Sequence, residues 1–243
     1  MNVVQEFSRF ADQYDTYNNV QSEVAKRLVS MIEQKYYNSI VDIGCGSGLI
    51  YKNIIERNIS FREFIALDFS QKMLDIHPSN RDIKKIHFDF NNRKRFDLLK
   101  DKYDFVVSSS SLQWSQDLDM TLKEVSRLSK KIYFSFFTSK TFSTIHKVAN
   151  IKSPIYSKDE IKDNISKYYD CTFDTREYYL SFDRVHEMFQ YIKKSGVSGG
   201  ERQLSYSQTK ELIKNYPLDY LEFEVLFAVG SVKKPTNLKG ATF

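Results

Sequence analysis

The residues best suited to chemistry in this sequence are glycines and aspartates that follow short apolar runs. Gly44, Gly46 and Gly48 all fall within the octapeptide VDIGCGSG at 41–48, although the whole chain of 243 residues has only eight glycines. Glycine lets the backbone adopt positive φ and approach a bound molecule closely. A glycine-rich turn between a strand and a helix also points backbone N–H groups and the helix N-terminus at a ligand. We therefore predict a nucleotide-type ligand at this turn.

The spacing of these glycines narrows the choice of nucleotide. It reads G-x-G-x-G, whereas dinucleotide-binding turns read G-x-G-x-x-G, and the Gly-Lys-Ser/Thr of phosphate-binding loops is missing. NAD and ATP are therefore disfavoured. Asp68 ends the second apolar run, about 20 residues after the last glycine of the turn, where a carboxylate can accept hydrogen bonds from both hydroxyls of a ribose. Asp89 closes the third run and can meet an adenine amino group, but both acids can equally be ordinary strand-end residues that cap helices.

A parallel sheet is the element that would bring these side chains together. Short apolar runs at 39–44, 64–70, 85–90, 103–111 and 131–137 alternate with segments of helical spacing. This alternation predicts five parallel strands joined by right-handed crossovers, which is a doubly wound α/β sheet. The expected helices are 20–32, 49–57, 71–76, 118–128, 157–167, 185–192 and 205–215.

The second half of the chain adds two further strands. Residues 171–182 read as one strand, and in YLEFEVLFAVG (220–230) apolar residues alternate with Glu222 and Glu224. This alternation indicates a strand with one more polar face, which suits an antiparallel edge position. We therefore expect a mostly parallel sheet of seven strands with an antiparallel C-terminal strand and inserted helices.

Composition limits the class of protein. Lys and Arg number 36 against 31 Asp and Glu, and this net charge of +5 is spread along the chain, so we expect no nucleic-acid partner. Cys45 and Cys171 have neither metal-ligand spacing nor a disulfide pattern, so we expect no metal. No apolar stretch approaches the ~18 residues that a membrane helix needs, and the first residues have no apolar signal core. We expect a cytoplasmic protein that does not bind membranes.

Residues 39–137 resemble the class I S-adenosylmethionine-dependent methyltransferases, which have a Rossmann-like fold. The first motif of that family reads hydrophobic-hydrophobic-D-x-G-x-G-x-G, and Val41, Asp42 and the three glycines match it. The resemblance implies that Asp42 and the glycine turn lie near the methionine part of S-adenosylmethionine. It further implies that Asp68 holds the ribose and that Asp89 with Phe90 borders the adenine. The predicted cofactor site, from which S-adenosylhomocysteine leaves, also includes Tyr14, Gln21, Cys45, Phe69, Met73 and Ser108.

Finer patterns resemble the malonyl-acyl-carrier-protein O-methyltransferases of biotin synthesis. They are the F-x-x-x-A-x-x-Y-D pattern at 7–15 with the later Gln21, the LQW triplet at 112–114, and the series MFQYIKKSGVSGG, RQLSYSQTKEL and YPLDYLEFEVLF. The resemblance implies that the chain esterifies the free carboxylate of malonyl-acyl-carrier protein or malonyl-CoA early in biotin synthesis. Trans-aconitate methyltransferases carry a similar triplet, so another small-carboxylate methyltransferase is an alternative. Residues 138–157 match no family motif.

The acceptor should reach the methyl group near the serine-rich stretch SSSSLQW, 108–114. Ser109 is small enough to let it approach, and Trp114 is either a wall of this site or a core anchor. A malonyl carboxylate is ionised at neutral pH and needs no general base. Arg202 is a candidate partner for that carboxylate or a solvated surface residue. Tyr14, which we expect to close over the methionine end together with Gln21, can instead be core.

We expect a single domain over 1–243 and a monomer. Its expected parts are an N-terminal helical lid (1–36), a cofactor-binding core (39–137), substrate-side insertions (138–216), a closing strand (217–231) and a flexible tail (232–243). The expected partner is an acidic acyl carrier protein that meets a basic rim of Lys193, Lys194, Arg202 and Lys210. Two alternatives are a tRNA methyltransferase, disfavoured by the dispersed charge, and a non-catalytic S-adenosylmethionine-binding partner protein.

Overall fold

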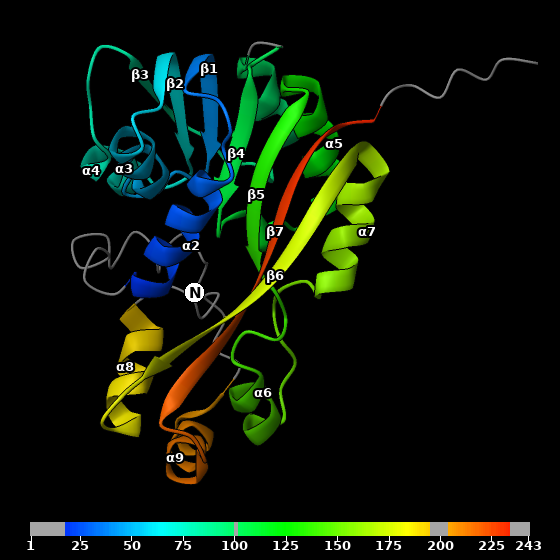
Figure 1. Cartoon of the computed structure of the whole chain (residues 1–243). Helices are drawn as coiled ribbons and strands as arrows, with labels where there is room; N and C mark the ends of the chain where they lie inside the picture. Colours follow the sequence, from blue (N-terminus) through cyan, green and yellow to red (C-terminus); the bar gives the residue numbers. More distant parts are fainter. Residues whose placement is uncertain (1–17, 100–101, 195–203, 234–243) are drawn as a thin grey trace, which may run out of the picture.

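The computed structural model describes residues 18–99, 102–194 and 204–233. Its centre is a seven-stranded sheet in the order β3-β2-β1-β4-β5-β7-β6 (Figure 1). The strands are β1 (Tyr36–Ile43), β2 (Ser60–Asp68), β3 (Ile83–His87), β4 (Phe105–Ser109), β5 (Lys131–Phe137), β6 (Tyr169–Ser181) and β7 (Tyr220–Val232). The described helices are α2 (Asn19–Ser30), α3 (Leu49–Glu56), α4 (Gln71–Ile76), α5 (Leu118–Leu128), α6 (Ser143–Ala149), α7 (Lys158–Tyr168), α8 (Val185–Lys194) and α9 (Tyr206–Asn215), with short 3-10 turns η2 (Arg93–Leu98) and η3 (Leu112–Trp114).

The pairing of the strands confirms the predicted doubly wound α/β fold. Strands β1 to β5 run parallel, β7 runs antiparallel to β5, and β6 runs antiparallel to β7. The strand order reverses between β1 and β4, because the chain continues outward from β1 to β2 and β3 and then returns to β4. In such sheets ligands bind outside the carboxyl ends of the strands at this reversal. The glycine turn follows β1 and the serine-rich stretch follows β4, so both lie at that place.

The predicted edge position of the last strand is wrong. β7 lies between β5 and β6, and every residue from 223 to 228 is buried. Glu224 is inside this buried row and only 4% exposed. Its carboxylate accepts a hydrogen bond of 2.6 Å from Thr138 Oγ1, and Lys140 and Lys158 lie 3.6 and 3.7 Å away. Because these groups compensate the charge, an alternating sequence can occupy an interior strand.

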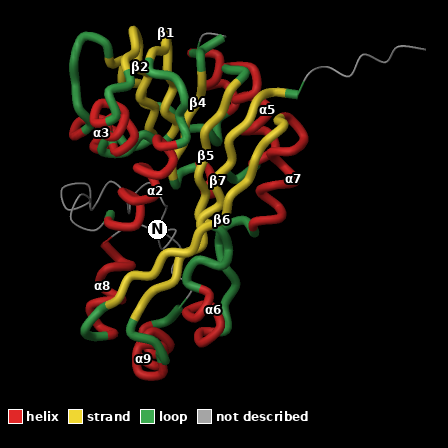
Figure 2. Tube along the Cα trace, in the orientation of Figure 1, coloured by secondary structure: helices red, strands yellow, loops and turns green. Residues whose placement is uncertain are grey.

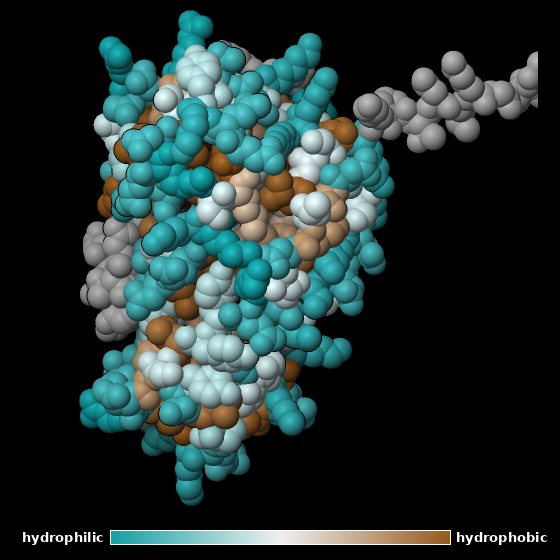
Figure 3. Space-filling model, in the orientation of Figure 1, coloured by the Kyte–Doolittle hydropathy of each residue, from teal (hydrophilic) through white to brown (hydrophobic). Residues whose placement is uncertain are grey.

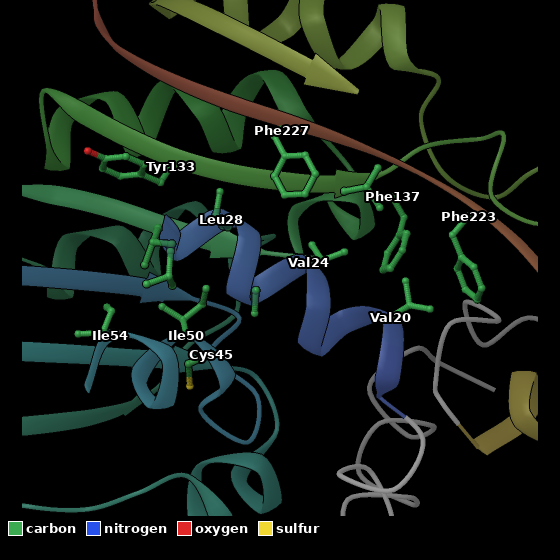
Figure 4. Close-up of a cluster of buried hydrophobic side chains, with 14 of the residues drawn as sticks. Val20, Val24, Leu28, Cys45, Ile50, Ile54, Tyr133, Phe137, Phe223 and Phe227 are labelled. Atoms are coloured by element: carbon green, nitrogen blue, oxygen red, sulfur yellow. The ribbon is translucent and has the colours of Figure 1, made fainter. Parts of the chain in front are cut away.

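Apolar clusters cover the two faces of the sheet. On one face, Val20, Val24 and Leu28 of α2 point toward the sheet, where Phe137 and Phe227 lie (Figure 4). Each such buried side chain contributes about 1.5–3 kcal/mol relative to an exposed one. The helices α5 and α7 cover the opposite face through a second cluster. The predicted helix at 20–32 is thus confirmed by α2, which packs its apolar side chains against one face of the sheet.

The β6–β7 hairpin extends beyond the parallel part of the sheet. β5 pairs with residues 225–231 of β7, whereas β6 continues to pair with β7 as far as Tyr220. The helices α6, α8 and α9 gather around this extension (Figures 1 and 2). α6 lies within 138–157, the stretch that matched no motif. The two residues that flank this helix, Phe142 at its N-cap and Asn150 at its C-cap, both have positive φ. The hairpin therefore positions the three helices α6, α8 and α9, which belong to the part of the chain expected to bind the acceptor.

Hydrophilic side chains cover most of the face seen in Figure 3, with smaller apolar areas between them. Across the described ranges, no helix has both the length and the apolar character that spanning a bilayer requires.

Candidate functional site

All three glycines of the turn have a backbone conformation that favours glycine, and at Gly44 and Gly48 the protein also leaves no room for a Cβ. Gly44, Gly46 and Gly48 have φ of 72°, 51° and 87°, a region that L side chains rarely adopt. A Cβ on Gly44 would lie less than 3.0 Å from Ser111 Oγ and Cβ, whereas a Cβ on Gly46 would meet no atom within 4 Å. A Cβ on Gly48 would lie 2.7 Å from Pro78 Cδ, so this glycine serves packing within the protein. The turn as a whole is anchored to β2, because Gly44 N and Cys45 N both donate to Leu67 O.

Asp68 joins the glycine turn to the end of β2. Its carboxylate accepts hydrogen bonds from Gly46 N at 2.9 Å and from Ser70 N at 2.8 Å. Burial raises the pKa of Asp68 to about 6, although these two N–H groups lower it. Each carboxylate oxygen has a further lone pair for a ligand hydroxyl. The side chain thus fixes the turn, as a strand-end acid would, and also faces the site; the ribose contact stays a prediction.

Asp42 is a buried carboxyl group in β1, two residues before the turn. It is 0% exposed, and neither carboxylate oxygen has a hydrogen-bond partner among the described residues. Burial, and then the nearby Asp68, raise the pKa of Asp42 well above its usual range. An orphaned buried acid is costly, and a cationic or hydrogen-bond-donating ligand group would reduce that cost. The amino group of a methionine moiety is such a group, so this part of the site fits the predicted cofactor.

Two small adjoining cavities, called the cofactor cavities below, bring together most of the residues predicted to bind the cofactor. They have volumes of about 50 and 30 Å³ and share Gly44, Gly46, Ser109 and Ser110. The larger of the two is also lined by Asp68, Phe69, Met73, Phe90, Ser111 and Trp114, and the smaller by Gln21, Cys45, Ser47, Leu49 and Ile50. The part of the chain that the structure describes contains no cluster of acids, histidines or cysteines suited to a metal ion.

Of the predicted cofactor residues that the structure describes, four lie outside these linings. Asp42 and Gly48 have been described above. Ser108 is buried and donates from Oγ to Ile43 O at 2.7 Å, so it joins β4 to β1. Asp89 lies beyond the end of β3, where its carboxylate accepts a hydrogen bond from Asn91 N at 2.9 Å. Asp89 thus closes a turn, and its contact with adenine stays a prediction.

Several predicted residues lie outside those that the structure describes. They are Tyr14, expected at the methionine end of the cofactor, Arg202, expected at the acceptor carboxylate, and the side chains of Lys193 and Lys194. Lys210 is described: on the exposed α9 its ammonium lies 4.8 Å from the ring centroid of Tyr206.

Trp114 stands where the cofactor site meets two further hollows. One is an apolar cavity of about 220 Å³ and the other a more polar groove, and Trp114 and Gln113 line both. The apolar cavity is walled by Phe137, Phe142, Ile145, Ile151, Pro154, Ile155, Phe189, Ile192, Leu204 and Leu212, with Thr141, His146, Ser153 and Thr209 as its other polar residues. Trp114 is only partly buried, which suits a wall of the site better than a core anchor.

Most residues that line this apolar cavity were not among the predicted site residues. Its α6 residues fall in 138–157, where no motif gave a signal. Gln113 did have a signal, since it is the middle residue of the LQW triplet, but it was not among the predicted site residues.

Comparisons with known proteins show that the chain is similar to methyltransferases. Residues 41–131 match the family described as a methyltransferase domain. A malonyl-[acyl-carrier protein] O-methyltransferase of Bacillus cytotoxicus is 27% identical over 230 residues, which cover 86% of this chain and 79% of that protein. Further bacterial proteins of that name are 22–26% identical.

Solved structures share the fold. The YcgJ protein of Bacillus subtilis superposes with a TM-score of 0.64 at 13% identity and covers 88% of this chain and 99% of its own. A phosphoethanolamine N-methyltransferase of Haemonchus contortus, solved with S-adenosyl-L-methionine, gives a TM-score of 0.58 at 13% identity over 93% of this chain and 57% of its own.

Proposed function

Since this chain is an S-adenosylmethionine-dependent methyltransferase of the class I fold, we propose that it esterifies the free carboxylate of malonyl-acyl-carrier protein. The similarity to curated enzymes of that name over most of the chain supports this substrate. The structural observation that carries the proposal is the position of Trp114. It lines both the cofactor cavity and the apolar cavity, so an acceptor held in the second has its reactive end beside the first.

The residues that would hold the methyl donor are those of the glycine turn and its neighbours. Gly44, Gly46 and Asp68 line the larger cofactor cavity, where Asp68 would accept hydrogen bonds from the ribose hydroxyls. The orphaned carboxyl of Asp42, buried two residues before the turn, would attract the amino group of the methyl donor. When bound, S-adenosylmethionine supplies a methyl group on a positively charged sulfur. In the transfer, a carboxylate oxygen forms the new bond to the methyl carbon as the bond to sulfur breaks, and its electron pair stays on sulfur.

No proton moves in this step, which agrees with the side chains at hand. The malonyl carboxylate is ionised near pH 7 because its pKa is close to 4. Among the described residues that line the apolar cavity, the titratable side chain is His146, and burial lowers its pKa, so it is neutral at pH 7. The work of the protein is therefore to align the carboxylate with the methyl carbon and to exclude water.

The lining also weighs against a trans-aconitate type of acceptor. Three carboxylates of a free tricarboxylate would lose their hydration in a cavity whose described lining has no lysine or arginine. A malonyl thioester brings one carboxylate on a neutral arm. The uncharged lining therefore favours the thioester.

One assay tests the proposal. The purified protein is incubated with methyl-labelled S-adenosylmethionine and, in parallel, with malonyl-acyl-carrier protein, malonyl-CoA or trans-aconitate, and base-labile methyl esters are counted. We expect esters on the malonyl thioesters. Labelling of trans-aconitate alone, with proof that S-adenosylhomocysteine binds, would refute the proposed acceptor and leave the methyltransferase activity standing.

We further propose that the basic residues 193, 194, 202 and 210 meet the acidic carrier protein. The rate with malonyl-acyl-carrier protein should then fall as salt rises, because steering between opposite charges is screened. The rate with a small malonyl thioester should change little. Equal salt effects on both substrates would contradict this docking.

A further inference from the structure

Gln113 has a buried amide whose oxygen is unpaired. The residue is only 3% exposed, and its Nε2 donates a hydrogen bond of 2.8 Å to Ser110 O. This bond fixes which end of the amide is the oxygen. Oε1 has no hydrogen-bond partner among the described residues. A buried acceptor left unpaired is costly, and native proteins leave few of them without a reason.

The same amide couples the acceptor side to the cofactor side. Ser110, which receives its hydrogen bond, has φ of 55° and lines both cofactor cavities. Positive φ at a residue other than glycine is strained and tends to mark functional sites. Gln113 itself lines the apolar cavity and the polar groove. Its unpaired oxygen thus belongs to a side chain that is positioned by the cofactor site and borders the acceptor cavity.

The cavity favours a particular kind of occupant. Most of its walls are aliphatic or aromatic, and its volume of about 220 Å³ is below the roughly 300–1,000 Å³ of ordinary small-molecule sites. A slim, uncharged chain suits such a space. An unpaired Oε1 requires a hydrogen-bond donor, and a carboxylate or thioester has none. A donor on the acceptor would therefore lie in the part that carries the malonyl group.

We propose that Gln113 Oε1 accepts a hydrogen bond from an amide N–H in the pantetheine arm of the acceptor thioester, and that Gln113 thereby selects arm-borne malonyl groups. This inference rests on the proposed function. The pantetheine arm is common to acyl carrier protein and coenzyme A, so the recognised chemistry is the amide-bearing arm rather than either carrier.

Two small thioesters test the proposal. Malonyl-N-acetylcysteamine has one arm amide, and the matching 2-acetoxyethyl thioester of malonate has an ester oxygen in place of the N–H. With the wild-type protein we expect kcat/KM to be about tenfold higher for the amide, since a site built around a donor discriminates against its absence. In Gln113→Leu the two substrates should react equally. Because each ratio is taken within one protein, a general loss of activity does not affect it.

Two control variants and two folding measurements separate a loss of the Gln113 hydrogen bond from a general loss of structure. Gln113→Met, which has a similar length, should give the same ratio as Gln113→Leu, and Gln190→Leu on the exposed face of α8 should keep the wild-type ratio. S-adenosylhomocysteine affinity and thermal unfolding confirm that each variant is folded. Equal rates for the two thioesters in the wild type would overturn the role of Gln113 and leave the proposed function intact, whereas no ester on either thioester or on malonyl-acyl-carrier protein would refute the proposed function itself.

The two natural carriers give a second test. Gln113→Leu should lower kcat/KM for malonyl-acyl-carrier protein and malonyl-CoA by similar factors, because both present the same arm. A loss confined to the carrier protein would assign the effect to protein docking and overturn the proposal.

Discussion

Replacing Gly44 by alanine tests whether the glycine turn is shaped by its contact with the serine-rich stretch. The new Cβ would meet Ser111 Oγ and Cβ at less than 3.0 Å, and the residue would have to keep a φ of 72°. Gly46→Ala is a matched control in the same turn. It also has positive φ, at 51°, but its Cβ would meet no atom within 4 Å.

The two variants should differ by the steric part alone. Left-handed backbone costs a residue with a Cβ about 1–2 kcal/mol, and this applies to both positions. Forcing atoms into an occupied space costs a further ~1–3 kcal/mol at Gly44. We therefore expect the free energy of unfolding to fall by about 2–5 kcal/mol in Gly44→Ala and by about 1–2 kcal/mol in Gly46→Ala.

Urea unfolding of the ligand-free protein measures both values. The double variant Gly44→Ala/Ser111→Gly removes the atoms that the new Cβ would meet, so its loss should return to that of Gly46→Ala. Equal losses in the two single variants, or a double variant no more stable than Gly44→Ala, would refute the argument. Gly46→Ala should still bind S-adenosylhomocysteine more weakly, because Gly46 lines both cofactor cavities and its methyl group would enter open space there.

Four further predictions concern charge and packing. The affinity for S-adenosylhomocysteine should fall about tenfold per pH unit below pH ~6 as Asp68 takes up a proton, and Asp68→Asn should remove this dependence in calorimetric titrations. Folding raises the pKa of Asp68 from 3.8 to about 6. Its contribution to the free energy of unfolding is therefore fullest below pH 3.8 and is lost as the pH rises through about 6, which urea unfolding at a series of pH values would show. Arg93→Ala and Arg127→Ala should each lower the free energy of unfolding by under ~1 kcal/mol, since both arginine side chains are exposed. The double variant should lose about 3 kcal/mol or more, because it leaves the buried carboxylate of Glu124 unpaired. Additive losses in a double-mutant cycle would contradict this. Gly230→Ala should lower the unfolding free energy by about 1–3 kcal/mol, because its Cβ would overlap the backbone of β6, and an unchanged thermal midpoint would contradict it.

The sequence was most informative where local pattern and tertiary environment agree. The inner parallel strands β1, β2, β4 and β5 are buried on both faces over most of the residues that read as continuous apolar runs. The glycine turn follows from backbone geometry that only glycine adopts readily. For that reason the α/β fold and the meeting of Gly44, Gly46 and Asp68 could be predicted.

Other features depend on contacts distant in sequence. The edge position of β7 was mispredicted because the groups that compensate Glu224 are at 138, 140 and 158. Helix α6 has only seven residues, and Glu222 of β7 accepts hydrogen bonds from its Ser143 Oγ and Thr144 N. Neither fact has a local pattern. Gln113 lies in the LQW triplet, but its unpaired Oε1 is visible only in the structure.

The extension of β7 beyond β5 implies a gradient of protection within one strand. Residues 225–231 pair with strands on both sides, whereas the only strand that pairs with 220–224 is β6, and on their other side Thr138 N and Phe142 N donate to Glu224 O and Glu222 O. Opening the outer segment breaks fewer hydrogen bonds between strands, so its amide hydrogens should exchange with deuterium sooner than those of the inner segment. The end of β7 around which α6, α8 and α9 gather can thus open locally while the part of the strand inside the sheet remains folded.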